Sequence, residues 1–148
     1  MTGKFTGAHA RSLDAKGRVV LPPSYLKALA ADGGDGSFWL TGMHGRLTAY
    51  ERAQWEEIVA KLCSIQLPSL KLANFKTRLI GLAQEIAPDG QGRVRIPQSL
   101  IREAALGKEI MLVGIMDKFE IWDQARFDAL AVEDVSEELS RLGIDVSL

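Results

Sequence analysis

Apolar residues along the chain fall into short runs that end at a proline, and this pattern occurs twice. The two runs are Val19-Val20-Leu21-Pro22 and Val94-Arg95-Ile96-Pro97. Short β-branched runs predict strands, and a following proline ends the strand because its nitrogen cannot donate to a ladder. An amphipathic segment follows each proline, at residues 24–30 and 98–104, and predicts a short helix. We expect Ser24 to cap the first of these helices.

Further apolar runs predict a pair of strands in each half of the chain. The expected strands cover residues 38–41, 46–50, 110–114 and 118–122, and the first two flank a turn at 42–45. Apolar residues at helical spacing then predict helices that begin at Glu51 and at Asp123, and a connecting helix after Pro68. A last helix over 136–142 is expected to end at Gly143, since glycine often terminates a helix.

The two halves are related by a constant offset. Asp14-Ala15-Lys16-Gly17-Arg18 and Asp89-Gly90-Gln91-Gly92-Arg93 stand 75 residues apart, and beyond the glycine loop at 32–37 the offset falls to 72. Loops accept insertions at little cost, so a loop three residues longer in the first half explains the change. An internal repeat of this kind indicates a tandem duplication.

The repeat predicts the domain organisation and the fold class. We expect one repeat at residues 5–53, connecting helices at 54–81, a second repeat at 82–125 and a helical tail at 126–148. Four short strands alone bury little apolar surface, so the two repeats are expected to pair into one pseudo-symmetric barrel. The predicted fold is therefore mainly β with helices, α+β by content.

Composition excludes several classes of protein. The chain has 148 residues, of which 47% are hydrophobic and 25% charged, as in an ordinary globular domain. Its longest apolar run, 110–116, is too short to span a bilayer, and no signal-like segment begins the chain, so we expect a cytoplasmic protein. The one cysteine, Cys63, cannot form a disulfide within the chain and is interpreted as a helix-packing thiol. No HExxH, CxxC, GxSxG or Walker sequence is present, and we expect no catalytic residue, metal or cofactor.

Charge is distributed unevenly although the formal net charge is only −1. Residues 1–30 carry five basic side chains and one acidic one, whereas residues 118–148 carry three basic and eight acidic side chains. This asymmetry predicts a basic face and an acidic face.

Three interpretations of the repeated Asp-x-x-Gly-Arg stretch compete. In the first, Asp and Arg form a surface ion pair that steadies a turn, which contributes little stability. In the second, Asp14 and Asp89 meet as an acid/base dyad, but an arginine four residues on would keep each carboxylate ionised. In the third, Arg18 and Arg93 are held at turns and bind phosphates or guanine edges.

The third interpretation assigns a role to each polar residue near the turns. Asp14 and Asp89 orient the arginines, while Gly17 and Gly92 supply the positive φ of the turn. Further basic residues are expected to contact the phosphate backbone and set the register without reading sequence, and these are Lys4, Arg11, Lys16 and Arg95.

The motif Phe5-x-Gly7 followed by Leu13-Asp14-Ala15-Lys16-Gly17-Arg18-Val19-Val20-Leu21-Pro22, with a second Asp89-x-x-x-Arg93, resembles the bacterial MraZ family. That family is a tandem form of the AbrB-like (SpoVT-AbrB) DNA-binding domain. The resemblance implies a double-split β-barrel, a ring-shaped homo-oligomer and nucleoid association. It also implies sequence-specific binding of double-stranded DNA, at direct repeats upstream of the division and cell-wall gene cluster, to regulate transcription.

The resemblance attaches function to Asp14, Arg18, Asp89 and Arg93, without a membrane or small-molecule substrate. The second repeat has Gln91 where the first has Lys16, so we expect the first repeat to bind DNA more strongly. The alternative is a ring-forming scaffold or antitoxin-like module that binds a protein through the same barrel. Salt separates the two, because binding to phosphates weakens steeply as salt rises.

Overall fold

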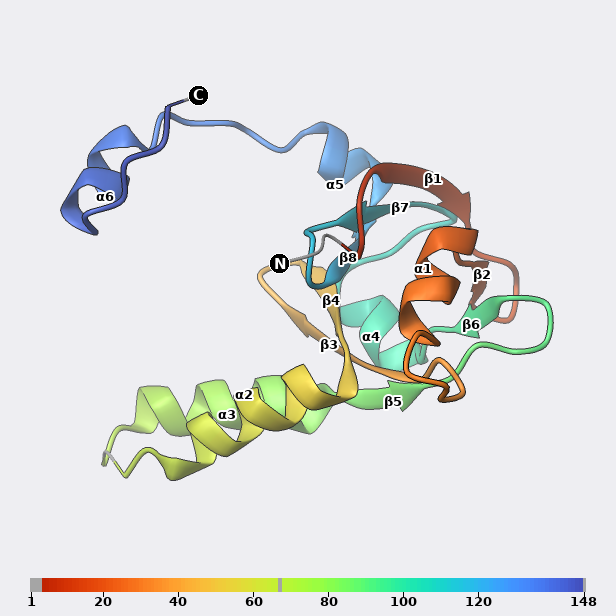
Figure 1. Cartoon of the computed structure of the whole chain (residues 1–148), viewed down its shortest axis with the longest axis horizontal. Coiled ribbons are helices and arrows are strands. Elements are labelled where there is room, and N and C mark those ends of the chain that lie inside the picture. Colours follow the sequence, from red (N-terminus) through yellow and green to blue (C-terminus); the bar gives the residue numbers. More distant parts are fainter. Residues whose placement is uncertain (1–3, 67, 148) are drawn as a thin grey trace.

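The computed structural model describes residues 4–66 and 68–147, and its elements repeat in the same order in both halves. The strands are β1 Ala8–Ser12, β2 Arg18–Val20, β3 Phe38–Met43, β4 Arg46–Tyr50, β5 Gln84–Ile86, β6 Arg93–Arg95, β7 Glu109–Gly114 and β8 Phe119–Asp123. The helices are α1 Pro23–Leu29, α2 Arg52–Ser64, α3 Leu70–Leu82, α4 Gln98–Glu103, α5 Gln124–Asp128 and α6 Ser136–Arg141. Figure 1 shows their arrangement.

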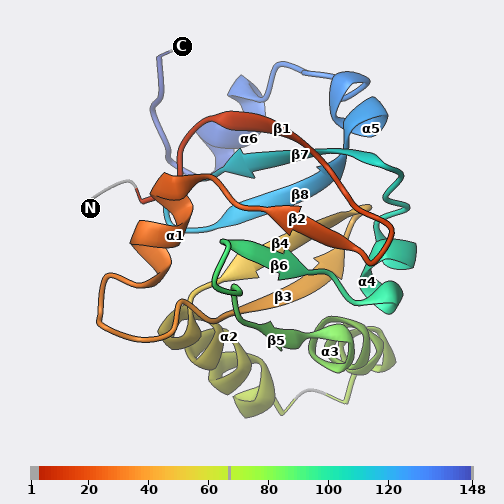
Figure 2. The ribbon, with the colours of Figure 1, turned by 90° about the vertical axis from the view of Figure 1, so that its right-hand side faces the viewer.

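The strands form a mixed α+β fold with two antiparallel sheets. One sheet has six strands in the order β1-β7-β8-β4-β3-β5, and the other has two strands, β2 and β6. The two halves exchange strands, because β1 pairs with β7 of the second half and β5 pairs with β3 of the first. Figure 2 looks onto the small sheet, which lies in front of the large one. Since β1 and β5 are edges of the large sheet, the strand pairing of the described residues does not close into a barrel.

A single apolar core lies between the two sheets and the helices α1 and α4. Val19 and Val94, the middle residues of β2 and β6, are both only 1% exposed. Tyr25 is fully buried among aromatic rings, and its hydroxyl donates to the carbonyl oxygens of Thr6 and Gly7 at 3.2 and 3.3 Å. Both halves contribute to this core, so neither half has a complete core of its own.

Several expected element boundaries are confirmed and others are wrong. The last helix ends at Arg141, one residue earlier than expected, and the expected glycine, Gly143, follows the cap residue Leu142 with a φ of 72°. The first helix, however, begins at Pro23, and Ser24 does not cap it; the cap position is Pro22, which makes no side-chain cap bond. Proline fixes a suitable φ for a helix start, so no side-chain cap is required. Cys63 is exposed at the end of α2, so its interpretation as a packing thiol is wrong.

Two extensions leave the body of the molecule. Helices α2 and α3 form a hairpin that packs on β3, and α5 packs on β7 and β8 before the chain continues to α6, which stands apart in Figure 1. Thr41 in β3 donates to the carbonyl of Leu79 at 2.6 Å and thereby ties α3 to the sheet. Among the described residues, no helix combines the length and apolar composition needed to cross a bilayer.

Candidate functional site

The first Asp-Arg turn is closed by its own aspartate. Oδ1 of Asp14 accepts the backbone N–H groups of Lys16 and Arg18 at 2.9 and 2.8 Å, and Oδ2 accepts Nε of Arg18 at 2.7 Å. The Gly17 N–H donates to the Asp14 carbonyl at 3.0 Å, with a φ of 78° at Gly17. These bonds hold the Arg18 side chain in one orientation at the start of β2.

The second turn repeats this geometry. Oδ1 of Asp89 accepts the N–H groups of Gln91 and Arg93 at 2.9 and 3.0 Å, and Oδ2 accepts Nε of Arg93 at 2.9 Å. Gly92 again has a positive φ, of 74°. The terminal guanidinium nitrogens of both arginines make no hydrogen bond within the part of the chain that the structure describes. Each guanidinium group is therefore held through Nε, and its two terminal nitrogens are available for other contacts.

Pairing of β2 with β6 brings the arginines of both repeats onto one face. Arg18 lies opposite Arg95, and Arg93 lies opposite Val20, while Val19 and Val94 pair between them and point into the core. Successive side chains of a strand point to opposite faces, so the four flanking residues share the outer face. We call this the ribbon face, and it consists of Arg18, Val20, Arg93 and Arg95.

Backbone bonds between the two repeats fix the ribbon face. The Leu21 N–H donates to the Gly92 carbonyl at 3.0 Å, and the Ile96 N–H donates to the Gly17 carbonyl at 2.8 Å. A Cβ at Gly17 would lie 3.1 Å from the Ile96 oxygen, and a Cβ at Gly92 would lie 2.7 Å from a methyl carbon of Leu26. Both turns thus need glycine for its positive φ, and at Gly17 a Cβ would also crowd the backbone oxygen of Ile96.

The other predicted basic residues divide into two groups. Arg11 reaches the ribbon face, because its Nε donates to the Val20 carbonyl at 3.1 Å. Lys16 is exposed in the first turn. Lys4 is instead placed beside the turn between β7 and β8, where its backbone N–H donates to Met116 and its ammonium group pairs with Glu51 at 3.0 Å.

The acid/base dyad has no geometric basis. Because β2 and β6 are antiparallel, the turns that precede them lie at opposite ends of the small sheet, which separates the two carboxylates. The backbone hydrogen bond from Arg18 lowers the pKa of Asp14, and the equivalent bond from Arg93 lowers the pKa of Asp89. A general acid near neutral pH needs a raised pKa, so neither carboxylate is suited to that role.

The structure adds two residues that sequence reasoning missed. Val20 is 49% exposed at the end of β2, opposite Arg93 on the ribbon face and in the position equivalent to Arg95, and the two-residue period from Arg18 would have found it. Lys108 lines a hollow beside Asp14 and Ala15, because its carbonyl accepts the N–H of Leu13 at 2.8 Å. No local signal relates Lys108 to the turn, since 94 residues separate it from Asp14.

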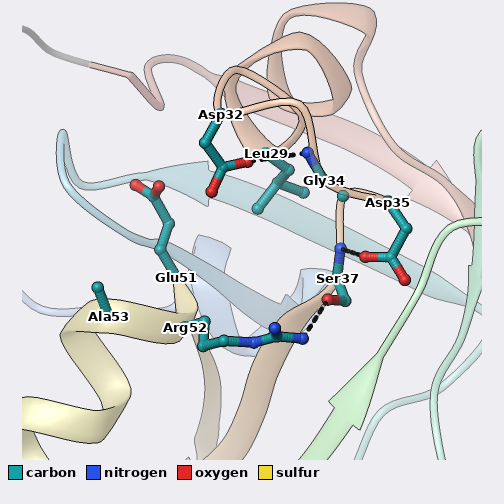
Figure 3. A pocket seen from close by; sticks show the side chains of 9 residues that line it. Leu29, Asp32, Gly34, Asp35, Ser37, Glu51, Arg52 and Ala53 are labelled. Atoms are coloured by element: carbon teal, nitrogen blue, oxygen red, sulfur yellow. Dashed lines mark hydrogen bonds between the residues drawn. The ribbon is translucent and has the colours of Figure 1, made fainter.

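In a second concave region, the carboxylates in the wall stabilise the glycine loop. It measures about 130 Å³ and lies between the glycine loop and α2 (Figure 3). Asp32 accepts the N–H of Gly34 at 3.2 Å and Asp35 accepts the N–H of Ser37 at 2.9 Å, so both carboxylates hold the loop. In the described ranges no three His, Cys, Asp or Glu side chains are grouped as metal ligands.

Comparison with known proteins shows to which family the chain is related. The family described as "MraZ protein, putative antitoxin-like" matches residues 4–74 and 79–142 of this chain. The chain belongs to the MraZ family. Three relatives bear the name transcriptional regulator MraZ, from Maridesulfovibrio salexigens, Nitratidesulfovibrio vulgaris strain Hildenborough and Pseudoalteromonas translucida.

These MraZ relatives match nearly end to end. The M. salexigens protein is 39% identical over 97% of this chain and 98% of its own length, and the N. vulgaris protein is 41% identical over 95% and 97%. The P. translucida protein is 40% identical over 94% of this chain and 91% of its own length. Both Asp-Arg turns and the whole ribbon face lie within the residues that the MraZ family matches.

Proposed function

We propose that this protein is a transcription regulator that binds double-stranded DNA through the ribbon face. The observation that carries the proposal is the β2–β6 pairing, which gathers Arg18, Arg93 and Arg95 on one exposed surface with Arg11 beside it. The names of the relatives agree with this role. The protein is proposed not to be an enzyme.

The two-stranded sheet has one of the shapes that fit the major groove of DNA. The major groove of B-DNA admits a two-stranded β-ribbon, and arginine can bind O6 and N7 of guanine with both arms of its fork. Arg18 and Arg93, which Asp14 and Asp89 orient through Nε, are proposed to read bases. The remaining basic side chains would bind phosphates, and these are Arg11, Lys16 and Arg95, with Lys4 in reach only if its pair with Glu51 opens.

We further propose that several copies assemble into a ring on DNA. Direct repeats upstream of the division and cell-wall gene cluster are the proposed operator, and nucleoid association would follow. Each subunit would meet one repeat, so that weak single contacts add up through effective concentration. This arrangement reconciles DNA binding with a formal net charge of −1.

Two finer structural assignments are also proposals. The first is that the small and large sheets form the two parts of a double-split β-barrel. The second is the division of the chain into a first repeat at 5–53, connecting helices at 54–81, a second repeat at 82–125 and a helical tail at 126–148. Because β1 and β5 are exchanged between the halves, limited proteolysis should cut the α2–α3 linker without releasing a separately folded repeat.

The test is binding to a labelled duplex with several tandem repeats, with wild type compared with Arg18→Ala at two salt concentrations. Assembly size is measured in both proteins. We expect Arg18→Ala to form the native assembly and to lose specific DNA binding. Unchanged DNA binding by Arg18→Ala would show that the turn is structural and that the DNA site is on another face.

A protein-binding, antitoxin-like role is the second candidate, and the family description favours keeping it. A mainly apolar protein contact depends little on salt, whereas phosphate contacts weaken as salt rises. A specific complex with flat salt dependence would therefore favour the protein-binding role over DNA regulation.

A further inference from the structure

The α2–α3 hairpin carries an apolar hollow that nothing in the described chain fills. It has a volume of about 500 Å³. The stacked rings of Trp39 and Trp55, with centroids 6.0 Å apart, form part of its wall. We call it the hairpin hollow, and its lining residues are Trp39, Trp55, Glu56, Val59, Ala60 and Ile80.

The end of the chain carries an apolar surface of its own. We define the tail as residues 131–147, which include α6. Its helix ends in paired bonds from the N–H of Gly143 to Ser140 and from Ile144 to Leu139, the Schellman motif. Val135 and Leu142, which share a helical face with Leu139, are 47% and 72% exposed.

The tail has no partner within the described chain. All its backbone and side-chain hydrogen bonds, and the ion pair of Arg141 with Glu137, stay inside residues 131–147. In Figure 1, α6 stands clear of both sheets. A helix of six residues is marginal in water without tertiary packing, so α6 needs a surface to cover its apolar side.

Charge makes the hairpin and the tail complementary. The hairpin, residues 52–82, has five basic residues and two acidic ones, Glu56 and Glu57, whereas the tail has five acidic residues and one arginine. Lys76 lies one helical turn from Ile80 and so borders the hairpin hollow. Lys71 and Lys76 form no ion pair among the described residues, whereas Lys61 and Arg78 are paired with acids.

We propose that the tail of one copy docks into the hairpin hollow of a neighbouring copy. Its apolar stripe would enter the hollow and its carboxylates would face Lys71 and Lys76. The hairpin packs on β3, near one edge of the large sheet. The tail is joined to α5, which packs on β7 and β8 toward the opposite edge. Two different complementary patches give head-to-tail association, which closes into a ring when the rotation between neighbouring copies permits it and otherwise continues as a filament. The inference rests on the proposed assembly of several copies and names the contact that builds it.

The single cysteine provides a direct test. Cys63 is exposed on α2, one turn beyond Val59 on the side of the hairpin hollow. Leu142→Cys places a second thiol on the tail, and oxidation should produce a ladder of dimers, trimers and larger species on a non-reducing gel. Gly90→Cys, in an exposed turn with no neighbour within 4 Å, is the matched control and should give at most dimers. A cross-linked monomer from Leu142→Cys would show docking within one chain, and no ladder would overturn the proposal.

A mixing experiment tests the same contact without cysteine chemistry. Leu142→Glu and Val59→Glu each place a charge in the contact, and each should raise the midpoint concentration of assembly by about tenfold or more. A mixture of the two should form one-to-one dimers, because the intact tail of one variant fits the intact hollow of the other. If the mixture stays monomeric while wild type assembles, the head-to-tail contact is wrong. Assembly is measured without DNA, so a failure of DNA binding does not affect the result.

Discussion

Removal of Arg95 should lower the salt dependence of DNA binding by the contribution of one phosphate contact. Arg95 is exposed and forms no ion pair in the described chain, so Arg95→Ala removes a charge and leaves both turns intact. Five basic side chains surround the face, namely Arg11, Lys16, Arg18, Arg93 and Arg95. Three of them, Arg11, Lys16 and Arg95, are proposed to neutralise one phosphate each, so affinity per subunit falls about 40-fold when salt rises fourfold, because the logarithmic slope is roughly 0.9 per phosphate.

With two such groups the same rise in salt lowers affinity only about 12-fold. The assay is fluorescence anisotropy of a labelled duplex at four or more salt concentrations, with the assembly state checked at each. Lys118→Ala is the control, because Lys118 pairs with Asp117 at the turn between β7 and β8. A slope that Arg95→Ala leaves unchanged and Lys118→Ala lowers would refute the ribbon face as the DNA site.

Three further predictions concern the scaffold. Gly17→Ala should destabilise the fold by about 1 to 2 kcal/mol and more than Gly33→Ala, because both glycines have a positive φ but only Gly17 has neighbours within 4 Å; thermal unfolding compares them. Thr41→Val should cost about 1 to 3 kcal/mol in urea unfolding, since it leaves the Leu79 carbonyl without its buried donor. Burial raises the pKa of Tyr25 to about 12 from 10. The contribution of Tyr25 to folding stability is therefore complete below pH 10 and is lost as pH rises toward 12. Tyr25→Phe should make the free energy of unfolding depend less on pH in that window.

Local features of the fold could be read from the sequence because they depend on neighbouring residues. The expected strand at 46–50 is β4 as the structure has it, and Gly143 marks the end of the last helix because a left-handed residue is needed just beyond the cap. The bonds of Asp14 to Lys16 and Arg18 also follow from short spacing and turn chemistry. The first helix start was misplaced by one residue because a proline cap position leaves no side-chain signal.

Pairings between distant segments could not be read in this way. The offset of 75 residues shows that two repeats exist, but it does not tell which strands of one repeat pair with which strands of the other. The β2–β6 pairing, which creates the ribbon face, depends on a register that only the shared core selects. Lys108 was missed for the same reason, since 94 residues separate it from Asp14, whereas Val20 could have been found from the two-residue period of its own strand.

The exchange of strands between halves constrains how the chain folds during synthesis. Ser12 in β1 pairs with Glu109 in β7, so β1 must wait for about 100 further residues before its partner leaves the ribosome. At ~5–20 residues per second the wait is about 5 to 20 s. During that time the N-terminal segment has an unpaired edge, and pairing across so long a separation is slow because the loop entropy is lost first. Production of folded protein should therefore respond to translation speed over the α2–α3 hairpin and the second repeat.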